Sequence, residues 1–415
     1  MKKIFVLVLI LVFVLCGCSG TVSQLDKDMY DFHDSLDEND NNPGIVGDAD
    51  DDIMLFSWFS YPEIKPYPLN QSKEEYRNKV SSVMGNLSKL GVSDVFVQVR
   101  PFADAIYPSK LFPSSSCVVE SQGDALPFDF LELIIQEAEK KNLRVHGWIN
   151  PYRIQSAFDE NKLFSESVYY KWFSQGEPDI KKAAGGLYFS PSSVKVQELI
   201  IEGVRELMEN YKLSGIHIDD YFYPTTEESF DKEEYSKYCQ DGGKLSLGDW
   251  RRANVSSLLS GIYCAVKSFS EEKIFSVSPS GDIEKNINEL YADVKLWCKE
   301  EGYCDLIIPQ IYFGFENSKL PFEKCALSWK QLMGEKTKLG AGLALYKAGL
   351  EDVYAGEGKN EWINNSDIIK RQYVFLTENG FDAVGIYSAS FIKFNENSQG
   401  KETQNLSDVL LYKNK

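Results

Sequence analysis

From residue 53 onward, short apolar segments typical of buried strands alternate with stretches that carry apolar residues at helical spacing. The eight predicted strands are 53–61, 94–101, 143–152, 215–222, 273–281, 304–314, 338–346 and 383–390. The seven helices predicted between them are 72–91, 129–142, 194–212, 249–269, 286–300, 322–334 and 366–380. Strands that alternate with helices form parallel sheets. Eight such strands favour an α/β fold, a (β/α)₈ TIM barrel with enlarged βα loops.

A doubly wound open sheet is the alternative architecture. No predicted strand is followed by the Gly-rich phosphate turn that often marks that class. The loop after the third strand, 153–191, is also long. Long loops after barrel strands are where a substrate cleft is built, so the barrel is the better interpretation.

The N-terminus has the pattern of an export signal. Lys2 and Lys3 precede an apolar run, Ile4–Leu15, that is too short to span a bilayer comfortably. The run ends in Leu-Cys-Gly-Cys, which resembles the bacterial lipobox, so we expect residues 1–18 to be a lipoprotein signal peptide with lipidation at Cys18. An uncleaved anchor helix is the alternative. Either way we expect an extracytoplasmic protein that is anchored to the bacterial membrane.

Residues 19–52 contain eleven acids and one lysine, which predicts a flexible acidic linker before a domain at 53–415. The whole chain has a net charge of −18. That balance argues against a nucleic-acid partner, because phosphate binding requires Lys and Arg. We also expect a monomer. Six cysteines remain after Cys18, and their disulfide pairing stays open.

Polar side chains gather at the predicted strand ends. Period-two alternation places them on the inward side of six strands. They are Gln98, Arg100, His146, Trp148, Asn150, His217, Asp219, Tyr221, Ser276, Ser278, Ser280, Gln310, Tyr312 and Tyr387. Barrel interiors are normally filled by apolar branched side chains, and unpartnered buried polar groups are costly. So many polar residues at strand ends therefore predict a cleft.

Two adjacent acids, Asp219 and Asp220, close the fourth strand. Glycosidic cleavage usually needs two carboxyl groups, an acid and a nucleophile or base. Strand neighbours point apart unless the strand has ended, so we expect Asp219 in the cleft and Asp220 supporting it or reaching over the rim. The partner acid is then expected from another loop, from Asp104 or Glu316. Each of these has the alternative interpretation of a surface carboxylate or helix cap.

Aromatic residues at the same end are expected to stack on sugar rings or simply to pack the barrel mouth. They are Trp148, Tyr152, Tyr221, Tyr223, Tyr312 and Phe313. With Gln98, Arg100, His146, Asn150, His217, Gln310 and Tyr387, all of these except Phe313 form the predicted substrate-binding set. No Walker, GxSxG or CxxC element is present, so we expect no cofactor and no metal. A His-Asp metal cluster around Asp219 is the open alternative.

Six segments, in order, carry a family resemblance: QVRPFADAIYPS, HGWINPYR, LYFSPSS, GIHIDDYFYP, SVSPSG and PQIYFG. Together they resemble the bacterial glycosyl-hydrolase-10-like family of extracytoplasmic lipoproteins, over roughly residues 53–390. The resemblance implies a (β/α)₈ barrel of the glycosidase type. Some members of that family cut peptidoglycan glycan strands, particularly strands without stem peptides.

The fourth-strand segment is also similar to that of α-amylase-like barrels. That similarity implies a nucleophilic role for Asp219 and an orienting role for His217. Those enzymes carry a Glu acid after the fifth strand, where SVSPSG has only serines. Retaining and inverting chemistry, which differ in carboxyl separation (about 5–5.5 Å against about 6.5–9.5 Å), both stay open.

The sequence therefore favours a membrane-anchored glycoside hydrolase that acts on peptidoglycan glycan or a related polysaccharide. The main alternative is a carbohydrate-binding barrel lipoprotein without turnover, which the missing fifth-strand acid supports. A solute-binding lipoprotein is the third hypothesis, and the eightfold alternation argues against its two-lobed fold.

Overall fold

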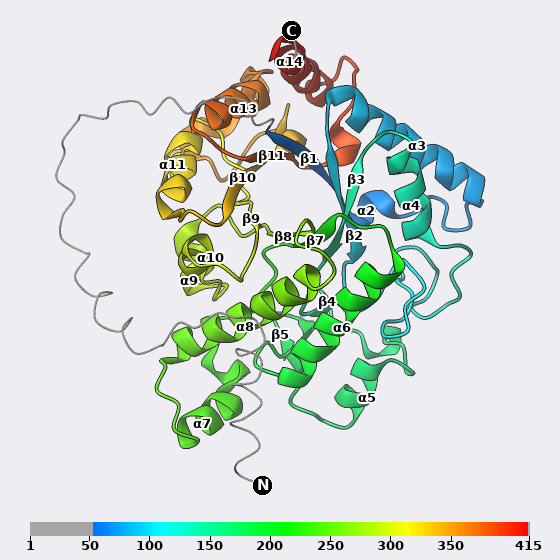
Figure 1. Ribbon diagram of the computed structural model, residues 1–415, viewed down its shortest axis with the longest axis vertical. Helices are drawn as coiled ribbons and strands as arrows, with labels where there is room; N and C mark the ends of the chain where they lie inside the picture. Colours follow the sequence, from blue (N-terminus) through cyan, green and yellow to red (C-terminus); the bar gives the residue numbers. More distant parts are fainter. Residues whose placement is uncertain (1–52, 414–415) are drawn as a thin grey trace, which may run out of the picture. The chain divides into compact units, whose positions relative to one another are not determined.

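The computed structural model describes residues 53–413, and these form a closed barrel of eight parallel strands with helices around it (Figure 1). The barrel strands are β1 (Met54–Phe59), β2 (Asp94–Arg100), β3 (Arg144–Ile149), β7 (Gly215–Ile218), β8 (Ile274–Val277), β9 (Leu306–Ile307), β10 (Lys338–Leu343) and β11 (Ala383–Ile386). They pair in chain order, and β11 closes the ring against β1. All eight predicted strands are present, and the predicted TIM barrel is confirmed.

The outer helices before α14 (Ser398–Lys413) follow the predicted segments closely. They are α3 (Lys73–Leu90), α4 (Phe130–Glu139), α6 (Val194–Asn210), α8 (Leu247–Lys267), α9 (Ile283–Asn288), α10 (Val294–Lys299), α11 (Phe322–Leu332) and α13 (Ile368–Glu378). The single helix predicted over 286–300 is wrong, because α9 and α10 are separate. Tyr291 has a φ of 51° between them, and Asp293 caps α10 by accepting the Leu296 N–H at 3.1 Å.

The βα loops are enlarged, as predicted. The loop after β3 holds a small antiparallel sheet and a helix, and the loop after β7 holds a further helix. These elements are β4 (Arg153–Gln155), β5 (Ile180–Ala183), β6 (Gly186–Phe189), α5 (Val168–Ser174) and α7 (Lys232–Gln240), while α2 (Tyr61–Ile64) and α12 (Glu361–Asn364) are short helices in other loops. In Figure 1 the α5 and α7 regions extend outward from the barrel.

Aromatic rings fill much of the barrel interior. Phe56 of β1 stacks on Phe96 of β2 with 4.6 Å between ring centroids, and Trp58 lies next to both. Two glycines opposite make room for Trp58. A Cβ added at Gly342 or Gly385 would lie 2.9 or 2.6 Å from the indole ring. The large ring can therefore extend across the barrel toward the strand ends that form the site described below.

Helix α14, which no sequence pattern predicted, packs against α13 and α3 and supplies the last helix of the ring (Figure 1). Its Glu402 is fully buried and accepts the backbone N–H groups of Ile368 and Ile369, each at 3.0 Å. These groups lie in the first turn of α13, where N–H groups have no partner within the helix. One carboxylate thus ties the two final helices together.

Glu402→Ala is expected to lower the free energy of unfolding by about 1–3 kcal/mol, because two buried N–H groups lose their acceptor. Urea unfolding followed by circular dichroism measures the change. Gln404→Ala is the matched control, since Gln404 is exposed on the same helix. Equal stability of the two variants would contradict the capping role of Glu402.

Three predictions lie outside the described residues: the signal peptide at 1–18, lipidation at Cys18, and the linker at 19–52. Among residues 53–413, no helix has both the length and the apolar character needed to cross a bilayer.

Candidate functional site

Asp219 lies at the C-terminal end of β7 and is buried, with 4% of its surface exposed. Its carboxylate accepts hydrogen bonds from three groups. The Asn150 amide lies 2.9 Å from both oxygens, the Trp148 indole Nε1 lies 3.2 Å from Oδ2, and the Tyr221 backbone N lies 3.4 Å from Oδ1. Donors from two neighbouring strand ends therefore hold this carboxylate in a fixed orientation.

The amide of Asn150 is itself oriented by a relay from β2 and α2. Gln98 Nε2 donates to Asn150 Oδ1 at 2.6 Å, and Gln98 Oε1 accepts the Tyr61 backbone N–H at 2.9 Å. Because the Asn150 oxygen is occupied, its NH₂ group faces Asp219. This relay fixes the donor side of the site before any ligand binds.

Asp220 is half-buried beside Asp219. β7 ends at Ile218, so neither acid is constrained by strand alternation. Burial and then the charge of Asp220 raise the pKa of Asp219. Burial also raises the pKa of Asp220, and a hydrogen bond from Gln310 opposes that rise. The charge of Asp220 thus acts on Asp219, and both acids follow the end of the strand.

Arg153 is the cation at this pair, and the sequence patterns did not single it out. Its guanidinium lies 4.6 Å from the centroid of the Phe102 ring and 4.2 Å from that of Tyr221, and its Nη2 donates to the Pro101 carbonyl at 3.1 Å. Its charge lowers the pKa values of both acids, against the larger effect of burial. Lys285, at the start of α9, has the same effect on Asp220.

Four rings form a wall beside the acids. Tyr387 lies 5.7 Å from Tyr312, 6.0 Å from Tyr346 and 5.9 Å from Trp58, measured between ring centroids. Burial, the neighbouring tyrosines and then the charges of Asp220 and Asp219 raise the pKa of Tyr312, so this wall lies within electrostatic range of the pair. Trp58 and Tyr346 were not predicted, although Trp58 falls on the inward side of the first predicted strand.

His217 was predicted to bind substrate, and the structure corrects this. Its side chain is fully buried; Nε2 accepts from the Trp58 indole at 3.0 Å and Nδ1 lies 2.9 Å from Ser276 Oγ. Because Nε2 is an acceptor, the ring is neutral with its proton on Nδ1, and burial lowers its pKa well below the usual value. His217 is a positioning residue for Trp58.

His146 lies at the opposite end of the barrel interior from the cleft, which is a second correction. It pairs with Gly215 at the start of β7, and its Nε2 lies 2.8 Å from Asp94 Oδ1. Burial would raise the pKa of Asp94, but bonds from His146 and Arg144 outweigh it and lower the pKa to about 2. A Cβ at Gly215 would lie 2.9 Å from His146 Nδ1, so the glycine leaves space for this ring.

Arg100 points toward the helices rather than the cleft. The register of β2 shifts between Gln98 and Arg100, so Arg100 pairs with the outward-facing Ile149. Its guanidinium lies 3.9 Å from the centroid of the Phe112 ring, and a Cβ at Gly203 of α6 would lie 2.1 Å from Nη1. The bulge reverses the side that simple alternation predicts.

Tyr152 and Tyr223 do not form part of the ring wall either. Both are buried, at 0% and 2% exposure, and belong to the main hydrophobic core. Tyr223 packs against Phe230 and Tyr291 at 5.9 and 5.2 Å between centroids. Both rings are buried by packing between loops, which strand periodicity cannot predict.

The two candidate partner acids also lie apart from the pair. Asp104 is buried within its own loop, where Gln122 Nε2 donates to its Oδ2 at 3.2 Å. Burial raises the pKa of Asp104 to about 6, with the Gln122 bond opposing the rise. Glu316 is exposed, and its backbone N donates to Glu361 at 2.9 Å. Neither acid is among the groups whose charges act on Asp219 or Asp220.

The structure thus brings most of the predicted set together at one end of the barrel. The residues that gather there are Gln98, Trp148, Asn150, Asp219, Asp220, Tyr221, Gln310, Tyr312 and Tyr387. The residues that sequence reasoning missed are Trp58, Arg153, Lys285 and Tyr346. Arg153 had a signal, since it directly follows the third predicted strand, but Lys285 lies in the first turn of α9, outside the predicted helix, and Tyr346 lies in the loop after β10.

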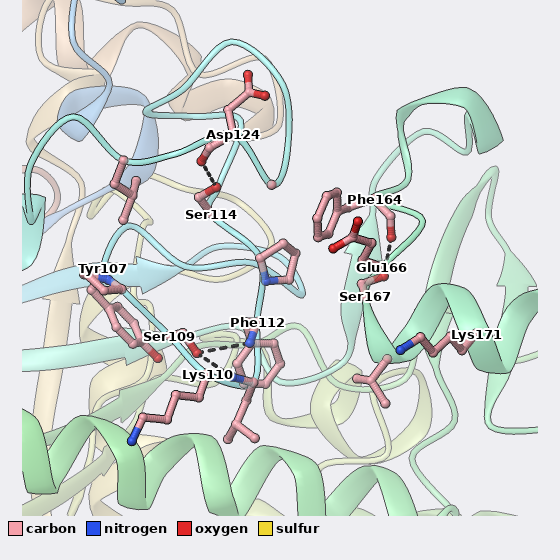
Figure 2. Close-up of a pocket in the computed structure, with 16 residues that line it drawn as sticks. Tyr107, Ser109, Lys110, Phe112, Ser114, Asp124, Phe164, Glu166, Ser167 and Lys171 are labelled. Atoms are coloured by element: carbon pink, nitrogen blue, oxygen red, sulfur yellow. Dashed lines mark hydrogen bonds between the residues drawn. The ribbon is translucent and has the colours of Figure 1, made fainter.

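A separate groove of about 670 Å³ lies between the loops after β2 and β3 (Figure 2). Its walls include Tyr107, Phe112, Phe164, Glu166 and Lys171, and Figure 2 shows Glu166 and Lys171 on its loop and α5 side. None of the predicted site residues lines it. Within residues 53–413, no group of three or more His, Cys, Asp and Glu side chains is arranged to hold a metal ion.

The profile of the family described as "Glycosyl hydrolase-like 10" matches residues 58–356, which include the strand ends and the acid pair. The chain belongs to this family. The expectation of this family and of its barrel fold is therefore confirmed.

Curated relatives of this family member include the glycosyl hydrolase YngK of Bacillus subtilis (strain 168), 32% identical over 316 residues, 71% of this chain and 59% of that one. The glycosyl hydrolase DigH of Escherichia coli (strain K12) is 32% identical over 293 residues, 64% of this chain and 65% of that one. The chain thus spans about three fifths of the length of these relatives.

Among solved structures, the glycoside hydrolase domain of PgaB (BpsB) from Bordetella bronchiseptica is similar with a TM-score of 0.57 and 10% identity. The alignment covers 86% of this family member and 98% of that chain. At this identity the likeness concerns the fold, and it agrees with the barrel described above.

Proposed function

We propose that this protein is a glycoside hydrolase that uses Asp219 and Asp220 to cleave O-glycosidic bonds in the glycan strands of the cell wall. The observation that carries the proposal is the position of two consecutive carboxyl groups just beyond the end of β7, where the charge of Asp220 acts on Asp219, beside a wall of rings. Two adjacent like charges that are buried together resist full ionisation, so such a pair retains a proton toward neutral pH. That proton is what general acid catalysis requires.

The surroundings favour a division of roles. Asp219 accepts from Asn150, Trp148 and the Tyr221 backbone, and these donors stabilise its ionised form. Asp220 accepts from Gln310 and from its own backbone N–H, fewer donors than Asp219 has, so we place the shared proton on Asp220 although burial raises the pKa of Asp219 to about 7. Asp220 then protonates the glycosidic oxygen, and its carboxylate afterwards removes a proton from the attacking water.

The choice of substrate rests on three features: the aromatic rings at the site, the net negative charge of the domain, and the lipidation expected near the N-terminus. Tyr221 is 49% exposed, so its ring is accessible for stacking on a pyranose face. The domain at 53–415 is acidic, which repels anionic polymers at long range and favours neutral or amino-sugar strands. Lipidation at Cys18 would place the enzyme outside the cytoplasm beside wall glycan. We infer a monomer that binds a polysaccharide and no nucleic acid.

Release of reducing ends tests this proposal. The purified protein is incubated with whole peptidoglycan, peptide-stripped peptidoglycan and a panel of neutral polysaccharides. We expect new reducing ends from the peptide-stripped strands, and a much smaller release with the Asp219→Asn variant. Binding of one of these glycans without release, equal in wild type and variant, would instead support the carbohydrate-binding barrel without turnover. The segment after β8 favours that second function, because it carries Ser278 and Ser280 in place of an acid.

The pH dependence of the reaction is expected to move upward in Arg153→Gln. Burial raises both pKa values, the charge of Asp220 adds to the rise at Asp219, and Arg153 opposes the rise at both acids. Without its charge both pKa values increase, so Asp219 ionises and Asp220 loses its proton at higher pH. Both limbs of the kcat/KM profile are then displaced upward by about 1 unit. The Arg205→Gln control, on the outer face of α6, keeps the wild-type profile, and an unmoved Arg153→Gln profile would contradict the electrostatic role.

A further inference from the structure

The carboxyl groups that the structure places at this site are the pair Asp219 and Asp220 and, beside the ring wall, Glu63. Glu63, at the end of α2, is the other acid whose charge acts on the Tyr387 ring of the wall. Its Oε1 accepts from Ser388 Oγ at 2.6 Å and from the Ser390 N–H at 2.7 Å, and its Oε2 accepts from the Ser60 N–H at 2.8 Å and from the Ser60 hydroxyl. Both oxygens are thus engaged in holding the loops after β1 and β11.

Asp219 is poorly suited to attack a sugar carbon. A carboxylate has about four acceptor directions, and three donor nitrogens, those of Asn150, Trp148 and the Tyr221 backbone, already occupy most of them at Asp219. Donors that stabilise these lone pairs reduce their reactivity. The Tyr221 contact, at 3.4 Å to Oδ1, is the longest of these contacts. Oδ1 is therefore the atom at which a substrate N–H is best accommodated.

We propose that the substrate itself supplies the nucleophile, the carbonyl oxygen of a 2-acetamido group on the sugar whose glycosidic bond is cleaved. This inference rests on the proposed function and names its substrate class, glycans of 2-acetamido-2-deoxy sugars. Asp219 holds the acetamido N–H, and the adjacent Asp220 acts as the acid. Two consecutive acids beyond a strand end suit this division of roles, because both carboxyl groups can contact groups on one side of a single sugar.

The aromatic wall supports the same assignment. Tyr387 lies between Trp58 and Tyr312 in this wall, with ring centroids 5.9 Å apart for Trp58–Tyr387 and 5.7 Å apart for Tyr312–Tyr387. The charge of Asp219 acts on both tyrosines. Rings beside a carboxylate form a surface that accepts an acetyl methyl group while the carboxylate binds the amide N–H.

The reaction balances without any further protein nucleophile. Asp220 transfers its proton to the glycosidic oxygen, the bond from that oxygen to C1 breaks, and the acetamido oxygen bonds to C1. The ring so formed is an oxazolinium, whose N–H is held by the Asp219 carboxylate. Water then attacks C1 and gives a proton to Asp220, the C1 bond to the acetamido oxygen breaks, and the acetamide is restored. Two displacements at C1 leave its configuration retained.

Acyl-group replacement tests this inference. Peptide-stripped peptidoglycan strands are N-deacetylated and then re-acylated with acetyl, fluoroacetyl or trifluoroacetyl groups, and kcat and KM are measured from reducing ends. Fluorine withdraws electrons from the carbonyl oxygen while adding little bulk. We expect re-acetylated strands to be cut like native ones and deacetylated strands to resist. From acetyl to trifluoroacetyl, kcat should fall about 10²-fold or more with little change in KM.

A binding measurement separates the role of Asp219 from simple recognition. The probe is a methylthiazoline fused to glucosamine, a stable mimic of the oxazolinium ring, titrated calorimetrically. We expect wild type and the Glu228→Gln control to bind it alike, since Glu228 is exposed on the same loop. Asp219→Asn, which loses the negative charge facing the ring nitrogen, should bind it about 10²-fold more weakly.

Failure of the inference and failure of the proposed function give different results. Equal cleavage of acetylated, fluoroacetylated and deacetylated strands, or a glycosyl group trapped covalently on Asp219, would overturn the inference and leave the hydrolase standing. Inverted configuration of the product, followed by proton NMR, would overturn it in the same way. If neither native nor re-acetylated strands are cut, the proposed function fails and the inference fails with it.

Discussion

Asp219→Asn is expected to lower kcat/KM by about 10³-fold or more on the glycan that the wild type cleaves. Asparagine keeps the shape of the side chain, so the contacts from Trp148 and Tyr221 have a partner of the same size. It cannot carry the negative charge that a positive transition state needs, and its NH₂ group opposes the NH₂ group of Asn150. The loss is therefore expected in kcat rather than in KM.

A matched variant makes that result interpretable. Glu228→Gln removes a carboxylate from the same loop without touching the pair, and it should keep kcat/KM within about twofold, as expected for an exposed substitution. Thermal unfolding of both variants checks that they fold. An Asp219→Asn protein that folds normally and retains wild-type turnover would remove Asp219 from the chemistry.

Arg251→Ala is expected to have the largest effect on stability, about 3–5 kcal/mol. Arg251 and Asp231 are both fully buried, and Arg251 Nη2 lies 2.6 Å from Asp231 Oδ1. The same guanidinium donates to the Thr226 and Glu227 carbonyls at 3.2 and 2.8 Å and to the Tyr291 hydroxyl at 2.8 Å. It ties α8 to the loop that follows the acid pair. Alanine would leave the Asp231 charge buried without its partner.

Urea unfolding measures this loss, with two comparisons. Arg205→Ala breaks an exposed pair with Glu202 and should change the free energy of unfolding by less than about 1 kcal/mol. The double variant Arg251→Met with Asp231→Leu removes both charges, so it should recover much of the stability lost in the single variant. A single variant as stable as the Arg205→Ala control would show that the buried pair does not hold this loop.

The acid pair and Arg100 show which side-chain directions strand alternation can predict and which it cannot. Alternation along the predicted strand 215–222 placed Asp219 on the inward side, and Trp148 and Asn150 contact it there although β7 already ends at Ile218. The same rule assigned Arg100 to the cleft, and this prediction is wrong. An extra residue in β2 turns the Arg100 side chain toward α6 instead. A bulge depends on the register between β2 and β3, which is a contact between segments about 50 residues apart. No pattern within one strand contains that information.

Several residues outside the barrel strands were not predicted correctly, because their positions also depend on contacts between distant segments. Lys285 and Tyr346 reach the site from the segments after β8 and β10, and Tyr223 leaves it to pack against Phe230 and Tyr291. Each position depends on which neighbouring loop buries the side chain. Hydrophobic periodicity has no counterpart in loops, so their side chains cannot be sorted into inward and outward sets.

The sequence by itself determined the eight strand–helix cycles, the parallel barrel and the end of it at which polar residues collect. Those features follow from local periodicity and from the rule that βα loops share one face. Only the tertiary structure decided that β7 stops at Ile218, that Asn150 and Trp148 converge on Asp219, and that His217 serves Trp58. These contacts join residues from different strands, and their geometry is set by barrel closure rather than by any single segment.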